Sequence, residues 1–476
     1  MQSQLPVKRK LGIITATSLV VANMIGTGIF TTTGIMANIL PDKFIILLCW
    51  LLGGLVALSG ALSYSELATR MPEEGGEYVY LKKLYHPVAG FLTGWTTFFV
   101  GFSAPIAGGA ISFAAYFMAA TGVESLFLPV NKDIAQKIIA VCVILLFTVI
   151  HSFGIKKGSF VQNILTALKI LIILGLSITG IYLGSGTLQS FTEITTRSVK
   201  ASDFGTVMML VMFAYSGWNA SSYIAGEIVN PKKTIPVSLI LGTLIVTSLY
   251  VIFNFFILKE VNTNQVKNTI TIVGNVSTQI YGNQIGSILG LLVSISLLSS
   301  ISAFIIIGPR IYYAMSLDRM FFSFASRIHP KYEVPRYSII LQGMLASIMV
   351  MIGTFEQLLI YIGFALNIFP WLAIFGLFIA RKRKIGEDLA VKTWGYPFVP
   401  IFYLISSLLI MITAFLNRPF EAIVSILTVL AGIPVYYLFI KKNFNYRITK
   451  QIEKYNPVHN NFIYETSNFK ISWLSG

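Results

Sequence analysis

Long apolar stretches separated by short polar segments run through almost the whole 476-residue chain. A helix needs about 20 apolar residues to cross the hydrocarbon core of a bilayer. The pattern therefore predicts an all-α membrane protein with twelve transmembrane helices, at 11–39, 43–69, 87–120, 134–153, 160–184, 204–227, 234–258, 284–316, 338–355, 357–380, 398–417 and 420–440. Between two of these spans, Met71–Pro87 predicts an interfacial helix or a re-entrant elbow. The polar tail beyond Lys441 is expected to be loosely ordered.

Composition supports this class of protein, and the placement of charge gives an orientation. Hydrophobic residues make up 55% of the chain, charged residues only 11%, and the mean hydropathy is +0.75. Such values are typical of a polytopic membrane protein. The net charge of +16 comes from short loops rather than from a nucleic-acid-binding surface. If the N-terminus is cytoplasmic, 26 Lys and Arg residues lie inside and 8 outside, which predicts cytoplasmic termini at both ends.

The sequence offers no basis for an enzyme, an ATP-driven pump, a metal site or a cofactor. It has no nucleotide-binding loop, no metal-ligand spacing and no nucleophile paired with a base. Its two cysteines, Cys49 and Cys142, both fall inside predicted spans, so neither a disulfide framework nor a metal site is indicated.

Two short glycine-containing segments interrupt apolar stretches, at Ile25–Phe30 and at Phe213–Trp218. Glycine allows a helix to unwind, and unwound backbone is tolerated at membrane depth only where it lines a cavity or binds something. Each break alone is also compatible with a kink or with a close-packed seam of small residues. A pair of interrupted helices at matching positions in two halves of a chain instead indicates a transporter's substrate site.

Several motifs resemble those of the amino acid–polyamine–organocation superfamily. Gly26-Thr27-Gly28-Ile29-Phe30 is similar to its first-helix motif, and Phe213–Asn219 to its sixth helix. Glu66–Pro72 followed by Gly75–Leu81 resembles its loop after the second helix. The likeness covers roughly residues 10–440 and points to the L-type amino acid transporter or bacterial serine/threonine exchanger branch.

This resemblance implies a LeuT-like fold with two inverted repeats of five helices each. The first repeat is expected in residues 1–190 and the second in 200–385, with helices 1 and 6 broken. Two extra helices follow in 396–442, and 443–476 forms a cytoplasmic tail. The chain departs from the family at Thr31-Thr32-Thr33, where a proline is common, and at Ser302-Ala303, where the L-type pattern often has Asn-Gly.

A free amino acid presents a carboxylate and an ammonium group, and both are costly to desolvate. The N-terminus of a half-helix supplies unpaired N–H groups and a positive dipole end, so Gly26, Thr27 and Gly28 are expected to bind the carboxylate. The ammonium group is expected to meet the unwound carbonyl groups of Met24, Ile25, Phe213, Ala214 and Ser216, near Gly217. Since neither break contains an acidic side chain, a zwitterion is favoured over a polycation.

Other site residues follow only from the resemblance. It implies that Phe213 forms an aromatic gate over the substrate, although ordinary core packing is the alternative. It also implies that Phe364 and Asn367 line the pocket, where a polar Asn367 would favour small or polar substrates.

Lys169 lies about ten residues into its predicted span, roughly 15 Å deep at 1.5 Å per residue. A charge at that depth is expected to face the bundle interior and to have a function. The resemblance implies that its ammonium group replaces the sodium ion of coupled relatives, near Ser299, Ser300 and Ser302, with Tyr250 joining the network. Whether Lys169 releases a proton or stays a permanently charged tie is left open.

The remaining titratable groups predict local roles. Glu66, Glu77 and Glu227 lie at cytoplasmic helix ends beside basic residues and are expected to form ion pairs or gate elements. His151 and His329 lie at cytoplasmic edges, where isolated histidines are usually solvated.

The sequence thus predicts a sodium-independent secondary transporter in a bacterial plasma membrane, which exchanges small neutral L-amino acids by alternating access. The alternatives are a proton-coupled uptake carrier for amino acids or amines, and a transporter-like nutrient sensor. The expected partners are the amino acid substrate and the lipid bilayer. Since the loop at 123–136 has no cysteine, no disulfide-linked heavy chain is expected, and a monomer is left open.

Overall fold

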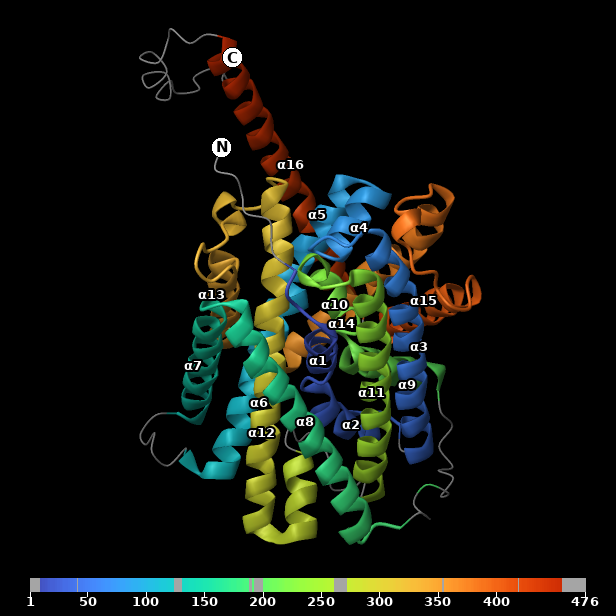
Figure 1. The fold of residues 1–476 in the computed structure, drawn as a ribbon. Helices are drawn as coiled ribbons and strands as arrows, with labels where there is room; N and C mark the ends of the chain where they lie inside the picture. The colour runs from blue at the N-terminus through green and yellow to red at the C-terminus, as the bar shows by residue number, and fades with distance from the viewer. Residues whose placement is uncertain are drawn as a thin grey trace, which may run out of the picture.

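The computed structural model describes residues 9–40, 42–123, 131–187, 191, 200–260, 272–352, 355–417 and 419–455. Within these residues the chain is a bundle of helices without a β-sheet (Figure 1). The longer helices are α1 (Ile13–Met24), α2 (Gly28–Ile39), α3 (Lys43–Arg70), α5 (Pro87–Thr96), α6 (Ala104–Thr121), α7 (Lys132–Ser152), α8 (Ile155–Leu183), α9 (Ala201–Tyr215), α11 (Pro231–Glu260), α12 (Ile272–Leu317), α13 (Arg336–Ile352), α14 (Phe355–Lys382), α15 (Phe398–Asn417) and α16 (Pro419–Tyr455). Short helices α4 (Glu77–Leu84) and α10 (Ala220–Tyr223) lie between them, with one-turn segments η4 (Ala225–Glu227), η5 (Ser323–Ser326) and η6 (Glu387–Leu389).

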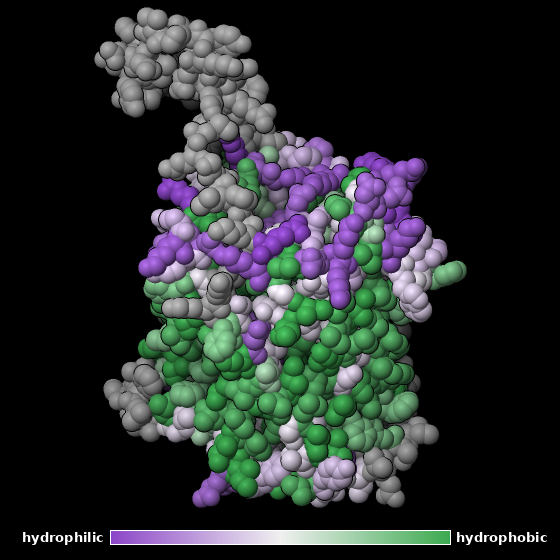
Figure 2. All heavy atoms as spheres, viewed as in Figure 1, coloured by the Kyte–Doolittle hydropathy of each residue, from purple (hydrophilic) through white to green (hydrophobic). Residues whose placement is uncertain are grey.

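The bundle has the surface of a membrane protein. In the described part of the chain, nine helical stretches are long and apolar enough to cross a bilayer. Figure 2 shows a broad hydrophobic band on one face, with hydrophilic residues gathered toward the end where α4 and the carboxyl end of α16 lie. We call this end the α4 end. A multi-pass all-α membrane protein is therefore confirmed, whereas the count of twelve crossings and the inverted repeat stay predictions.

Both predicted interruptions are present. The first apolar stretch is split between the end of α1 at Met24 and the start of α2 at Gly28. The second is split between the end of α9 at Tyr215 and the start of α10 at Ala220. Since α1 packs against α8, α11 and α12, the first break lies inside the bundle, where its backbone is shielded from lipid.

Three features of the fold differ from, or add to, the sequence predictions. The stretch predicted at 87–120 is one apolar span, but its middle is a π-helical segment, η1 (Thr97–Ser103). Such bulges in α-helices are frequent at functional sites. The expected interfacial element after α3 contains α4, which packs between α5 and α14. The prediction of a loosely ordered chain beyond Lys441 is wrong as far as Tyr455, because α16 continues to that residue. Residues 456–476 lie outside the described part.

Candidate substrate site

The two breaks face each other at very short range, and glycine makes this approach feasible. A Cβ atom at Gly28 would lie 2.7 Å from the Cβ and 2.8 Å from the Cα of Ala214 in the second break. Gly217 has a φ of +96°, and a Cβ there would lie 2.9 Å from the backbone carbon of Asn23. Because side chains larger than hydrogen do not fit at either position, the glycines predicted to unwind the helices also let the two breaks touch.

A cavity lies between the breaks, and most residues predicted to bind substrate line it. From the first break these are Met24, Gly26, Thr27 and Gly28, and from the second they are Phe213, Ala214 and Ser216. Its remaining walls are Asn23, Pro105, Gly108, Gly109, Ser300 and Phe304. All of these residues are neutral, so the cavity between the breaks suits a ligand with no net charge, such as a zwitterion.

The start of α2 offers unpaired hydrogen-bond donors to this cavity. Within the described structure, the amide N–H groups of Thr27, Gly28 and Ile29 have no backbone acceptor, as expected for the first turn of a helix. The Thr27 hydroxyl makes no capping hydrogen bond to α2, and Thr27 lines the cavity. Of these residues Thr27 and Gly28 line the cavity, so two N–H groups and one hydroxyl lie where the positive end of the helix dipole favours a carboxylate.

The predicted carbonyl acceptors divide into occupied and available ones. The Met24 carbonyl accepts hydrogen bonds from the Gly26 amide at 2.9 Å and the Tyr250 hydroxyl at 2.6 Å. The Ile25 carbonyl accepts from Lys169 and Ser300, each at 2.5 Å. Because a carbonyl oxygen has two lone pairs, both groups are fully used within the protein.

The carbonyls of the second break keep more capacity. Among the described residues, the Phe213 carbonyl accepts only from the Ser216 amide at 3.0 Å, and the Ala214 carbonyl only from the Tyr250 hydroxyl at 2.9 Å. The Ser216 carbonyl accepts no hydrogen bond in the described residues. The structure therefore favours the second break as the acceptor side for an ammonium group.

Lys169 joins three helices behind the first break. Its side chain has no solvent exposure, and its Nζ donates to the Ile25 carbonyl at 2.5 Å and to the Ser300 hydroxyl at 2.7 Å. Ser300 lies on α12 and Lys169 on α8, so the lysine ties the end of α1 to both helices. This is the location at which the resemblance places a sodium surrogate.

Other residues expected in this network have different partners. The Ser299 hydroxyl accepts from Gln162 of α8 at 3.2 Å, and Ser302 pairs with His151 at 2.9 Å. The expectation that His151 is solvated is wrong, since it is 3% exposed and held between α7 and α12. Tyr250 does not contact Lys169 through a hydrogen bond but bridges the two breaks, through Met24 and Ala214.

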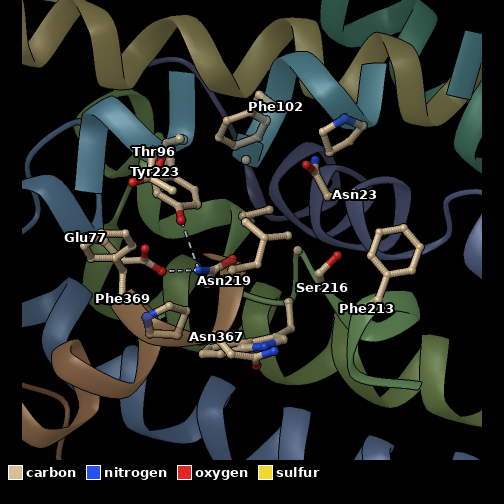
Figure 3. Close-up of a pocket in the computed structure, with 18 of the residues that line it drawn as sticks. Asn23, Glu77, Thr96, Phe102, Phe213, Ser216, Asn219, Tyr223, Asn367 and Phe369 are labelled. Atoms are coloured by element: carbon tan, nitrogen blue, oxygen red, sulfur yellow. Dashed lines mark hydrogen bonds between the residues drawn. The ribbon is translucent and has the colours of Figure 1, made fainter. Parts of the chain in front are cut away.

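A second cavity adjoins the first and shares Asn23, Pro105, Phe213, Ser216 and Phe304 with it. Figure 3 shows Phe213, Ser216 and Asn23 on one side of this cavity and Glu77, Tyr223 and Asn219 on the other. Gly217 and Asn367 also line it. Phe364 belongs to α14, but its side chain lies outside the described part.

Several lining residues were not predicted from the sequence as substrate-site residues. Asn23 has a polar side chain just before the first break, and a polar residue inside an apolar stretch could have indicated a place in the site. Asn219 was part of a recognised motif. Thr97, Gly101 and Phe102 come from the π-helical segment η1, and nothing in the local residue pattern marks that departure from α-helix.

Two of the three acidic residues that were expected to form ion pairs or gate elements do form ion pairs. Glu66 pairs with Arg70 at 2.8 Å and with Arg381 at 2.6 Å, which joins α3 to α14. Glu227 pairs with Arg310 of α12 at 2.7 Å. The third acidic residue, Glu77, has hydroxyl and amide partners instead.

Comparison with known proteins shows the family of this chain. The sequence pattern described as amino acid permease matches residues 11–448. The chain belongs to this family. It is 32% identical over 437 residues to the serine/threonine exchanger SteT of Bacillus subtilis (strain 168), covering 90% of this chain and 96% of that protein. It is 26% identical to the mouse (Mus musculus) b(0,+)-type amino acid transporter 1, with 94% and 92% covered. The human (Homo sapiens) cystine/glutamate transporter is also 26% identical, with 92% and 87% covered. The family and these relatives are transporters and not enzymes.

Proposed function

We propose that this protein is a sodium-independent exchanger of small neutral L-amino acids in a bacterial plasma membrane. The observation that carries the proposal is the neutral cavity between two facing helix breaks, with free N–H donors at one side and carbonyl acceptors at the other. These groups match the two charged ends of a zwitterion, and the similarity to a serine/threonine exchanger supports exchange of small substrates.

The proposed binding mode assigns one end of the substrate to each break. The carboxylate receives hydrogen bonds from the amides of Thr27 and Gly28 and from the Thr27 hydroxyl. The ammonium group donates to the carbonyls of Phe213, Ala214 and Ser216. Phe213 lies at the boundary of the two cavities, which is the place required of a gate. The substrate's side chain then faces the adjoining cavity, where Asn367 supplies polarity.

Lys169 makes the protein independent of sodium in this account. Its ammonium group already holds the Ile25 carbonyl and the Ser300 hydroxyl, which are oxygen ligands of the kind a sodium ion would use. The lysine side chain ties the first break to α8 and α12, and so keeps the break ordered in the absence of a bound cation.

The proposed architecture has twelve membrane crossings. The two five-helix repeats are 1–190 and 200–385, so that each break belongs to the first helix of its repeat, and 396–442 adds two helices. Both termini, the 443–476 tail and the α4 end are cytoplasmic. Figure 2 shows hydrophilic residues gathered at the α4 end, and the excess of Lys and Arg in the loops assigned to the cytoplasm supports this orientation. Alternating access then opens the cavity to either side as the broken helices rock.

Exchange in proteoliposomes tests the proposal. Vesicles loaded with unlabelled L-serine should take up external labelled L-serine, with or without sodium, and empty vesicles should not. Uptake into empty vesicles driven by a pH gradient alone would contradict exchange and indicate a proton-coupled carrier. Binding of L-serine without flux would contradict transport and indicate a sensor.

A further inference from the structure

The second cavity contains an acidic side chain that the proposed binding mode does not use. Glu77 is the first residue of α4, directly after Gly75 and Gly76, both of which have positive φ. A Cβ at Gly76 would lie 2.5 Å from the ring of Tyr223. This tight turn, which only glycine allows, brings the start of α4 against α10 and places Glu77 in the cavity wall, where it is 3% exposed.

The carboxylate of Glu77 is held by neutral groups. Its Oε1 accepts hydrogen bonds from the Tyr64 hydroxyl at 2.8 Å and from the Asn219 amide at 2.6 Å. Asn219 Nδ2 also lies 3.1 Å from the Tyr223 hydroxyl, as the dashed lines in Figure 3 show. These donors orient the carboxylate from one side, and they leave its negative charge without a counter-ion.

The contrast with the neighbouring acidic residues is informative. Glu66 and Glu227, which are as buried as Glu77, each pair with at least one arginine. Among the described residues, Glu77 pairs with no lysine, arginine or histidine. Burying an unpaired charge is costly, so this arrangement is suited to a cation that arrives from outside the protein.

We propose that Glu77 forms a second ammonium-binding subsite, which receives the amino group of the amino acid as it passes between the cavity of the helix breaks and the α4 end. This inference rests on the proposed transport function. Continuity supports it, because the two cavities share Asn23, Phe213 and Ser216. Asn219, which orients the Glu77 carboxylate, is the last residue of the second break before α10, so a movement of that break also moves the subsite.

The protonation of Glu77 gives this subsite a pH dependence. Burial raises the pKa of Glu77 to about 7, against the hydrogen bonds of Tyr64, Tyr223 and Asn219, which lower it. Above that pH the carboxylate is charged and attracts an ammonium group, and below it the neutral acid does not. Its titratable neighbours are the phenols Tyr64 (α3), Tyr80 (α4), Tyr223 (α10) and Tyr403 (α15). Phenols ionise ordinarily at about pH 10.

The other elements packed against α4 add no charge here. Helix α5 contributes Thr96 to the cavity wall, and α14 contributes Leu366, Asn367, Phe369 and Pro370. None of these side chains titrates. Glu74, three residues before Glu77, is also buried, and burial raises its pKa to about 8, but its charged neighbours are Glu227 and Arg310. A change of function between pH 6 and 8 that disappears in Glu77→Gln and remains in Glu74→Gln is therefore attributable to Glu77.

Sidedness of substrate affinity tests this subsite. L-serine exchange is measured in inside-out and right-side-out membrane vesicles, which present opposite faces of the same protein to labelled substrate. Glu77→Gln keeps the size of the side chain and its capacity to accept from Tyr64, but it removes the charge. It should raise KM at the α4 face about tenfold, as expected for losing a hydrogen bond to a charged group, and leave KM at the opposite face unchanged.

Two further variants and the pH profile complete the experiment. Glu77→Asp, which keeps the charge, should restore part of the affinity. Glu73→Gln removes an exposed carboxylate of the same loop that pairs with Lys83, and it should behave as the unmodified protein does. The KM of the unmodified protein at the α4 face should rise as the pH falls from 8 to 6, whereas that of Glu77→Gln should stay flat.

Three outcomes would overturn the subsite. They are an unchanged KM in Glu77→Gln, an equal rise at both faces, and a pH profile that Glu77→Gln retains. Absence of exchange in the unmodified protein is a different failure, since it would overturn the proposed function itself.

Discussion

Replacement of Lys169 by alanine should abolish most exchange while leaving the bundle folded. The lysine contributes two short hydrogen bonds to the environment of the first break, to the Ile25 carbonyl at 2.5 Å and the Ser300 hydroxyl at 2.7 Å. A hydrogen bond involving a charged group contributes about 1.5–3 kcal/mol. Without the lysine, Ile25 keeps only its bond from Ser300, and the end of α1 loses its tie to α8.

The expected magnitude follows from these contacts. Two such bonds at the lower end of the range amount to about 3 kcal/mol, which corresponds to roughly a hundredfold loss in the population of the ordered break. Exchange of L-serine by Lys169→Ala should fall by a comparable factor. Lys169→Met should be similarly impaired although it fills most of the volume, because it too lacks the charge and both donors.

Exchange in proteoliposomes checks this prediction, with folding monitored by the elution profile and thermal stability of the purified protein. Lys331→Ala removes an exposed lysine from the segment between α12 and α13 and serves as the control. Flux and affinity in Lys169→Ala equal to those of the unmodified protein would refute the reasoning and remove Lys169 from the mechanism.

Three further substitutions test the geometry of the breaks. Thr27→Ala should weaken binding of every amino acid in a competition panel by a similar factor, about fivefold to tenfold, because the carboxylate is common to all; selective loss for some substrates would count against it. Tyr250→Phe removes the hydroxyl that joins the carbonyls of Met24 and Ala214 and should slow exchange about tenfold, and an unaltered rate would exclude this bridge from the transport cycle. Gly28→Ala should lower both thermal stability and exchange, because the new Cβ would lie 2.7 Å from the Cβ of Ala214 and overpacking typically costs about 1–3 kcal/mol. Gly175→Ala is the control: its Cβ would meet nothing within 4 Å, so neither property should change.

The membrane class, the two breaks and most of the cavity between them could be predicted from the sequence. Apolar length identifies membrane helices because the bilayer has a fixed thickness. Glycine alone is not decisive, since Gly53, Gly54 and Gly60 lie inside the unbroken α3, but two glycine-containing segments at matching positions of the chain indicate a site. The same reasoning found Lys169, since a charge inside an apolar span is costly and must have partners.

The partners themselves could not be predicted, because they depend on packing between helices distant in sequence. Ser299, Ser300 and Ser302 are the same residue type within one short stretch, so the sequence does not distinguish them. In the described structure Ser300 is the serine that contacts Lys169, and Ser302 pairs with His151. The occupied state of the Met24 and Ile25 carbonyls depends on α8, α11 and α12 together. The sequence also could not distinguish Glu77 from Glu66 and Glu227, because all three lie near basic residues along the chain and only the fold decides which become paired.

A structure determined with L-serine bound would show whether the start of α2 binds the substrate. We expect the carboxylate of the ligand within about 3.2 Å of the amide nitrogens of Thr27 and Gly28, with its ammonium group at the carbonyls of the second break. A carboxylate bound elsewhere, with the N-terminus of α2 unoccupied, would contradict this expectation.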